Sequence, residues 1–298
     1  MQAEAASFWG WQQRYSDEKR CLQALVKLRW PEGFRCECCG HRKGWLLQTR
    51  HVYECAGCHH HTSVTAGTVF HNTKLPLAKW FWCIYWMSTD KGSISALRLT
   101  KLVGVSWITA HRMLRKLRVA MGDQNRLYRL EGTVELDDAF VGGKRPGKRG
   151  RGAGGKTAIL AACGHNDGRP GFVAMKVVDR VDQDSVKAFA EEAIAPGQTL
   201  HTDAFAALRV LAEGHHHVAK VTPPELVDEW LPWVHVVISN FKSYVLGTYH
   251  GISGRYVQEY LDEYCYRLNR RFWENQIPNR LLKLCAMHQP VLLQPVGC

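Results

Sequence analysis

The stretch TVELDDAF, residues 133–140, determines how the second half of the chain is interpreted. Its β-branched and apolar residues run into acids, which is typical of a buried strand that ends in carboxylates. A second stretch, TLHTDAF at residues 199–205, repeats the arrangement. Asp203 ends its expected strand as Asp137 ends the first. If the two strands are neighbours, both carboxylates lie at one sheet edge, where their hard oxygens suit magnesium or manganese.

Spacing alone does not decide which acid of the first strand belongs to the site. Side chains alternate between the two faces of a strand, so Glu135 and Asp137 share one face and Asp138 takes the other. An aspartate after a strand is also a common turn or helix cap. Both interpretations stand at this point.

Periodicity around these strands predicts a mixed α/β sheet with helices on its faces. The expected strands cover residues 133–136, 158–162, 172–178, 199–202 and 217–221, and the expected helices cover residues 183–193, 205–213, 238–248 and 254–272.

Two CxxC pairs, Cys36 with Cys39 and Cys55 with Cys58, stand earlier in the chain with fifteen residues between them. This spacing is typical of two knuckles that hold one metal ion, and four thiolates suit tetrahedral zinc. A closed four-sulfur site leaves no position for a substrate, so we predict a structural role. Iron also takes such sites. The nearby Cys38 and the histidines 59–61 are alternative ligands, although a solvated basic loop explains the histidines better.

The text between these two regions is helical. Helices are predicted at Leu77–Ser88, Ile94–Lys101 and Trp107–Ala120, and Ser16 is expected to open a shorter one near the start of the chain. The apolar run WFWCIYWM, residues 80–87, is expected to be core. Two helices joined by a short turn with glycine form the pattern of a helix-turn-helix. The expected DNA contacts on its last helix are Arg112, Arg115, Lys116 and Arg118.

Charge supports a nucleic-acid partner. The 298 residues contain 39 Lys and Arg against 27 Asp and Glu, a formal charge of +12. Six basic residues and no acid occupy residues 144–156, which we interpret as a flexible arm on the DNA backbone, with a merely solvated loop as the alternative. Its expected contacts are Lys144, Arg145, Lys148, Arg149 and Arg151.

Five segments are predicted: an N-terminal helical segment at residues 1–32, a zinc ribbon at 33–74, a helix-turn-helix region at 75–128, a catalytic domain at 129–275 and a tail at 276–298. No apolar run is long enough to cross a bilayer, and the first twenty residues lack the pattern of a secretory signal. We therefore expect a cytoplasmic, nucleoid-associated protein.

The combination of motifs resembles the zinc-ribbon DDE transposases of bacterial insertion sequences, the family numbered fifteen-ninety-five. The matching text lies between residues 29 and 271 and comprises RWPEGFRCECCG, YECAGCHHHTSVTAGTVFHNTKLPLAKW, VELDDAFVGGK, HTDAF, HVVISNFKSYVLGTYHGIS and YLDEYCYRLNRR. The resemblance implies an RNase H-like catalytic domain that binds magnesium or manganese, cuts DNA at element ends and joins the cut strands to a target. Pairing of two ends implies a homo-oligomer on DNA.

Carried onto this sequence, the resemblance assigns the first acid to Asp137, the second to Asp203 and the third position to Asn240. Asparagine is neutral, so such a site holds one negative charge fewer and is expected to bind a second ion more weakly. Lys242 and His250 are expected near phosphate, or else simply in solvent.

Three acids are possible compensators for Asn240, namely Glu259, Asp262 and Glu263. Ion pairs with Arg267, Arg270 and Arg271 on the same helix explain them better. Two other functions compete with transposition: a DNA-binding regulator whose α/β domain is inactive, and a nuclease that does not join the cut ends.

Overall fold

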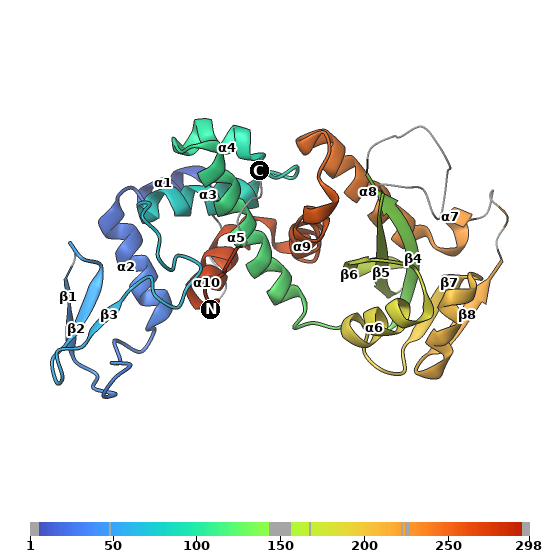
Figure 1. Ribbon diagram of the computed structural model, residues 1–298, viewed down its shortest axis with the longest axis horizontal. Coiled ribbons are helices and arrows are strands. Elements are labelled where there is room, and N and C mark those ends of the chain that lie inside the picture. Colours follow the sequence, from blue (N-terminus) through green and yellow to red (C-terminus); the bar gives the residue numbers. More distant parts are fainter. Residues whose placement is uncertain are drawn as a thin grey trace. The chain divides into compact units, whose positions relative to one another are not determined.

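The computed structural model describes residues 6–47, 49–142, 156–166, 168–221, 223 and 227–293. The chain divides into two compact units, one formed by residues 1–120 with 272–298 and the other by residues 121–271. Both units are drawn in Figure 1, and each is described by itself below. No helix in the described part of the chain is both long enough and apolar enough to span a membrane.

Helices make up most of the first unit, and both ends of the chain contribute to it. The last helix packs against α2 and α3, so the unit closes on residues far apart in the sequence. Its elements are α1 (Phe8–Arg14), α2 (Glu18–Arg29), α3 (Leu77–Thr89), α4 (Ala96–Val103), the greater part of α5 (Trp107–Asn125), the 3-10 helix η4 (Arg271–Gln276) and α10 (Ile277–Met287).

The apolar run at residues 80–87 is core, as predicted. Trp80, Phe81, Ile84 and Met87 are buried on α3. The remaining tryptophans of this run, at positions 82 and 86, are half-buried and pack their rings against Phe8 of α1.

Two helix starts differ from the prediction because neighbouring side chains cap them better. Asp17, not Ser16, caps α2, since its carboxylate accepts the Arg20 N–H at 2.9 Å. Helix α4 begins at Ala96 after the cap Ser95. The backbone of Ser93 is left-handed, with φ of 61°, so the helix cannot begin at Ile94.

A small antiparallel sheet carries the cysteine pairs. It consists of β1 (Gly44–Leu47), β2 (Val52–Cys55) and β3 (His61–Ser63), in that order. The rings of Phe34 and Tyr53 stack beneath it with centroids 4.6 Å apart. Arg29 at the end of α2 donates to the Val64 carbonyl at 2.9 Å, which ties this sheet to the helix.

The second unit is built on a five-stranded mixed sheet of order β6-β5-β4-β7-β8. Strands β4, β5 and β6 pair antiparallel, and β7 and β8 continue the sheet parallel to β4. This is the RNase H-like arrangement that the sequence predicted. The strands are β4 (Thr133–Val141), β5 (Thr157–Asn166), β6 (Arg169–Val178), β7 (Thr199–Asp203) and β8 (His216–Lys220).

Helices cover both faces of this sheet. Helices α8 (Pro232–Tyr249) and α9 (Val257–Leu268) pack on the face that includes Ala139 and Val141 of β4. Helix α6 (Gln183–Ala193) and the 3-10 helix η1 (Ala206–Glu213) pack on the face that includes Val134 and Leu136. Two short elements, α7 (Val227–Trp230) and η3 (Gly254–Tyr256), precede α8 and α9 respectively.

Side chains of Gln258 and Asn269 cover the open edge of the sheet at strand β6. Asn269 accepts the N–H of Val173 at 2.8 Å and donates to its carbonyl at 2.9 Å, and Gln258 accepts the Val177 N–H at 2.8 Å. These amides occupy backbone groups of β6 that another strand would otherwise pair with. Polar residues in the segment 258–271 therefore stabilise the edge of the sheet.

Helix α8 begins six residues earlier than the sequence predicted, at Pro232 and not at Ile238. Proline suits the first turn of a helix, because its missing N–H needs no partner there. The next two N–H groups of this helix, from Trp233 and Val234, donate to a carboxylate of β4. Local sequence does not show such a distant partner.

Candidate functional site

The four predicted zinc ligands come together in the first unit. The Sγ atoms of Cys36, Cys39, Cys55 and Cys58 all lie within 4.8 Å of one another, and Cys36–Cys58 and Cys39–Cys55 are each 3.6 Å apart. Sulfurs bound tetrahedrally to zinc at 2.3 Å lie about 3.8 Å apart, so the arrangement fits this ion. The N–H of Gly57 donates to Cys55 Sγ at 3.3 Å, which favours the thiolate that zinc requires.

The alternative ligands lie outside this cluster. Cys38 is exposed and is not among the grouped thiols. Nδ1 of His59 lies 3.0 Å from Oε1 of Glu54, and Nε2 of His61 lies 3.6 Å from Oε2. The four cysteines therefore form a closed site of the structural kind.

In the second unit the two predicted acids stand on neighbouring parallel strands. The last paired positions of β4 and β7 are Glu135 and His201, and Asp137 and Asp203 each follow two residues later. Equal spacing from a shared register places both aspartates at the same level and on the same face of the sheet. That face is the one that α8 covers.

Each aspartate accepts a local backbone N–H through its Oδ1 atom. Oδ1 of Asp137 accepts the N–H of Asp138 at 2.8 Å, and Oδ1 of Asp203 accepts the N–H of Phe205 at 3.1 Å. The Asp137 side chain is only 17% exposed, so it is partly desolvated. Two partly held carboxylates on one face suit a hard divalent cation.

Helix α8 supplies a third group that the sequence analysis did not identify. Nε2 of His235 lies 3.1 Å from Oδ2 of Asp137. A histidine in the sequence gave no signal by itself, because the expected helix began after it. The early start of α8 is what brings its imidazole to the acid.

Asn240 occupies a different part of α8. At about 100° per residue, it lies about 140° around the helix from His235, and its side chain is exposed. Of the two, His235 is the residue whose side chain contacts Asp137. Lys242, which is exposed and seven residues after His235, returns to within about 20° of the histidine.

Glu135, the alternative to Asp137 as the first acid, and Glu263, a possible compensator for Asn240, each contact other groups. Glu135 shares the face of Asp137, as alternation predicted, but its carboxylate is buried and accepts the N–H groups of Trp233 and Val234. Burial raises the pKa of Glu135, and these two N–H donors oppose the shift. Glu263 lies 3.8 Å from Arg267 on α9, which is the predicted ion pair.

The remaining arginines of that helix end also contact the backbone. Arg271 donates to the Gly171 carbonyl at 3.1 Å, at the edge of the sheet, and Arg270 donates to the Tyr266 carbonyl at 2.9 Å. Both contacts are with backbone oxygens, because the last turn of a helix and a sheet edge leave carbonyls without partners.

The predicted DNA contacts of the helix-turn-helix differ in exposure. Arg112 is exposed on α5, whereas Arg115 and Arg118 are buried and Lys116 is half-buried, with Nζ 3.4 Å from the Val69 carbonyl. The first turn of α5 also exposes Trp107. The five basic residues of the predicted arm, Lys144, Arg145, Lys148, Arg149 and Arg151, lie outside the described residues.

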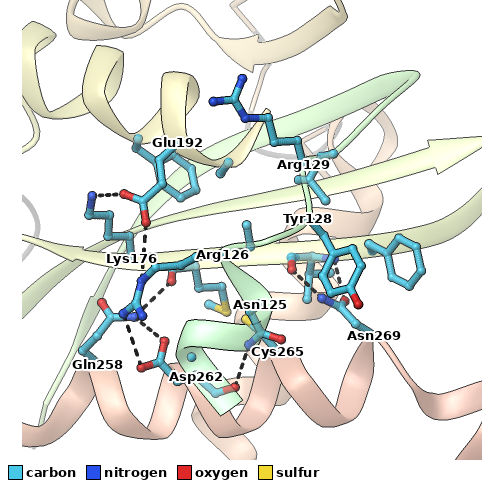
Figure 2. Close-up of a pocket in the computed structure, with 18 residues that line it drawn as sticks. Asn125, Arg126, Tyr128, Arg129, Lys176, Glu192, Gln258, Asp262, Cys265 and Asn269 are labelled. Carbon is cyan, nitrogen blue, oxygen red and sulfur yellow. Dashed lines mark hydrogen bonds and ion pairs between the residues drawn. The ribbon is translucent and has the colours of Figure 1, made fainter. Parts of the chain in front are cut away.

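A cavity of about 180 Å³ lies elsewhere in the second unit, between the end of α5, β6, α6 and α9. Figure 2 shows Arg126 between the carboxylates of Glu192 and Asp262. Its Nε lies 3.6 Å from Oε1 of Glu192, and its Nη2 lies 3.9 Å from Oδ2 of Asp262. Burial raises the pKa of Asp262 to about 6. Neither aspartate of the strand ends lines this cavity. Four of its charged residues pair with one another: Arg126, Lys176, Glu192 and Asp262.

Comparison with known proteins matches the regions of the chain that contain the two sites. Residues 129–269 match the model of an ISXO2-like transposase domain, and residues 16–61 match that of a transposase zinc-ribbon domain. A protein described as an uncharacterized protein in transposable element ISH50, from Halobacterium salinarum, is 28% identical over 140 residues. That match covers 46% of this chain and 45% of the relative, so the chain aligns with slightly under half of the relative's length.

Proposed function

The chain belongs to the zinc-ribbon DDE transposases with an ISXO2-like domain, and on that basis we propose that it cuts and joins DNA strands at the ends of a mobile element. The observation that carries the proposal is the shared level and face of Asp137 and Asp203 on neighbouring parallel strands. Carboxylates in that arrangement hold the cations that phosphoryl-transfer enzymes use.

The residues of this site have the donor chemistry for a divalent cation. Asp137 and Asp203 would hold magnesium or manganese, which when bound would activate the attacking oxygen and stabilise the leaving one. His235 would serve as the third group, because its imidazole already lies beside Asp137. Its neutral nitrogen favours manganese over magnesium in comparison with a third carboxylate.

Other residues would bind and orient the DNA. Lys242, on the flank of α8 that carries His235, would contact a phosphate close to the reacting bond. Arg112 on α5 would contact DNA from the helix-turn-helix, since the first turns of a recognition helix enter the major groove. The basic arm at residues 144–156 would follow the backbone, and two chains would pair the two element ends.

Purified protein, candidate element ends and a divalent cation test this proposal. We expect end cleavage and strand joining that require the cation and disappear in Asp137→Ala and Asp203→Ala. Cleavage without joining would indicate a nuclease. Binding that leaves both strands intact would indicate a regulator, and retained cleavage in Asp203→Ala would refute the assignment of the site.

A further inference from the structure

Helix α8 has no N-terminal cap of its own. Leu231 occupies the capping position and contributes no side-chain hydrogen bond, and Pro232 is the first helical residue. Oε2 of Glu135 replaces the missing cap, because it accepts the N–H groups of Trp233 and Val234, each at 2.8 Å. A carboxylate at this end of a helix also interacts favourably with the helix dipole.

This cap is rigid. Glu135 lies on the central strand β4, paired on both sides of the strand to Cys163 and His201, and is only 2% exposed. Its second oxygen, Oε1, lies 3.7 Å from Nε2 of His165. A buried side chain on a central strand can move little, so it fixes the helix end that it holds.

Trp233 and Val234, which Glu135 holds, immediately precede His235, the residue that contacts Asp137. Glu135 and Asp137 are two positions apart on one face of β4, and they contact residues 233–234 and residue 235 of α8 in the same order. The two carboxylates therefore hold consecutive positions of one helical turn. A rotation of α8 by one residue, about 100°, would turn His235 away from Asp137.

We propose that Glu135 is a positioning residue, which sets the rotation of α8 so that the imidazole of His235 meets Asp137. This inference deepens the proposed function and rests on it. It assigns no chemical step to Glu135.

The chain contains a matched control. Oε1 and Oε2 of Glu18 accept the N–H groups of Leu77 and Ala78 at 2.8 and 3.1 Å, at the start of α3 after Pro76. Glu18 therefore caps a helix from a distance as Glu135 does. It belongs to the other unit and lies on a different helix from the acid site.

Variants separate positioning from stability. In Glu135→Ala we expect the cleavage rate at saturating DNA to fall by about 10- to 100-fold, the usual effect of losing a partner that orients a ligand. The Kd for DNA ends should stay near the wild-type value. Glu135→Gln should restore most of the rate, because one amide oxygen can accept both N–H groups. Glu18→Ala should lower the Tm and leave the rate of the folded protein unchanged.

A double variant tests whether Glu135 acts through His235. If it does, Glu135→Ala should reduce the cleavage rate little further once His235 is already alanine, so the two losses do not add. Additive losses would overturn the proposal, because a general loss of stability would affect both backgrounds equally.

A spectroscopic measurement decides the same point without activity. The side-chain NMR resonances of His235 should shift in Asp137→Asn, which reports their contact, and the same shift should appear in Glu135→Ala but not in Glu18→Ala. An unchanged His235 ring in Glu135→Ala would overturn the proposal. If the wild-type protein fails to cleave DNA, the proposed function fails, but this measurement still tests the role of Glu135.

Discussion

The two candidate metal sites are assembled in opposite ways. Four cysteines from two short knuckles form the first, and their thiols are already grouped within 4.8 Å. The second takes Asp137 from β4, Asp203 from β7 and His235 from α8, so its residues are far apart in the sequence. In the described part of the chain, the cysteines are the only group of three or more His, Cys, Asp or Glu that is gathered so closely.

The difference fits the function proposed for each site. A structural ion supplies the folding energy of a module too small to have a substantial core, so its ligands lie close together in the chain. A catalytic site needs a rigid scaffold and open coordination positions, so its ligands come from separate elements of a sheet that folds without the ion. Zinc loss should therefore unfold the ribbon, whereas loss of an aspartate should slow the chemistry and leave the fold intact.

The largest effect is expected on removal of zinc. Structural zinc contributes on the order of 10 kcal/mol to small modules, so chelation or Cys39→Ser should unfold β1, β2 and β3. Hydrogen exchange should show loss of amide protection at residues 44–63. Cys38→Ser is the matched control and should keep both metal and protection. Intact protection in the zinc-free protein would show that the ribbon does not depend on the ion.

The next effect concerns the aspartates. Asp137→Asn and Asp203→Asn should each lower the strand-cleavage rate on the order of 10²- to 10³-fold, the usual loss for a group that stabilises the charge of the transition state. Circular dichroism and zinc content should not change. Asp138→Asn tests which face of β4 carries the site. The side chain of Asp138 lies on the face opposite to that of Asp137, so this variant should keep its activity. Equal losses at Asp137 and Asp138 would contradict the proposed geometry.

A smaller effect should distinguish the two candidates for the third position. His235→Ala is expected to slow cleavage by about 10- to 100-fold and to increase the concentration of manganese required. Asn240→Ala should have little effect, because Asn240 is exposed on another flank of α8. Greater damage from Asn240→Ala would return the third position to the residue that the family resemblance implied.

The smallest effect concerns an acid that belongs to neither site. The pKa of Asp262 is raised from 3.8 to about 6, mainly by burial, so the folded protein binds its proton more tightly than the unfolded chain does. This group therefore stabilises the fold below about pH 4, and the benefit is lost as the pH rises to 6, by at most about 3 kcal/mol.

Asp262→Asn removes this dependence. Urea unfolding should show the variant to be more stable than the wild type at pH 7.5 and no more stable at pH 4.5. Its cleavage rate should equal that of the wild type, unlike the rates of the strand-end variants. A variant that is less stable at pH 7.5 would show that the pairing of Asp262 with Arg126 outweighs the cost of burial.

Local patterns predicted the parts of the molecule that local interactions form. Helix α6 has the predicted bounds, because Asp182 caps it and an apolar face buries it. The cysteine pairs fixed the zinc site for the same reason. The shared edge for Asp137 and Asp203 depended on the condition that their strands are neighbours. The sheet order meets this condition, and the shared face follows from the period of a strand.

The missed residue depended on a contact between distant segments. Pro232 suits the start of α8, but no residue near it caps the helix, because the cap is Glu135, almost a hundred residues earlier. The expected helix therefore began at Ile238 and excluded His235. Similarly, the burial of Arg115 and Arg118 depends on tertiary packing around α5, which residue type alone does not show.

The proposed convergence of the two strands and α8 on one cation can be measured directly on the zinc-loaded chain. Ferrous iron bound in place of magnesium, treated with ascorbate and peroxide, cuts the polypeptide close to wherever the ion is held. We predict cuts near residues 137, 203 and 235, all of which disappear together in Asp203→Asn. Cuts near only one of these three segments, or cuts that persist in Asp203→Asn, would show that the aspartates do not share an ion.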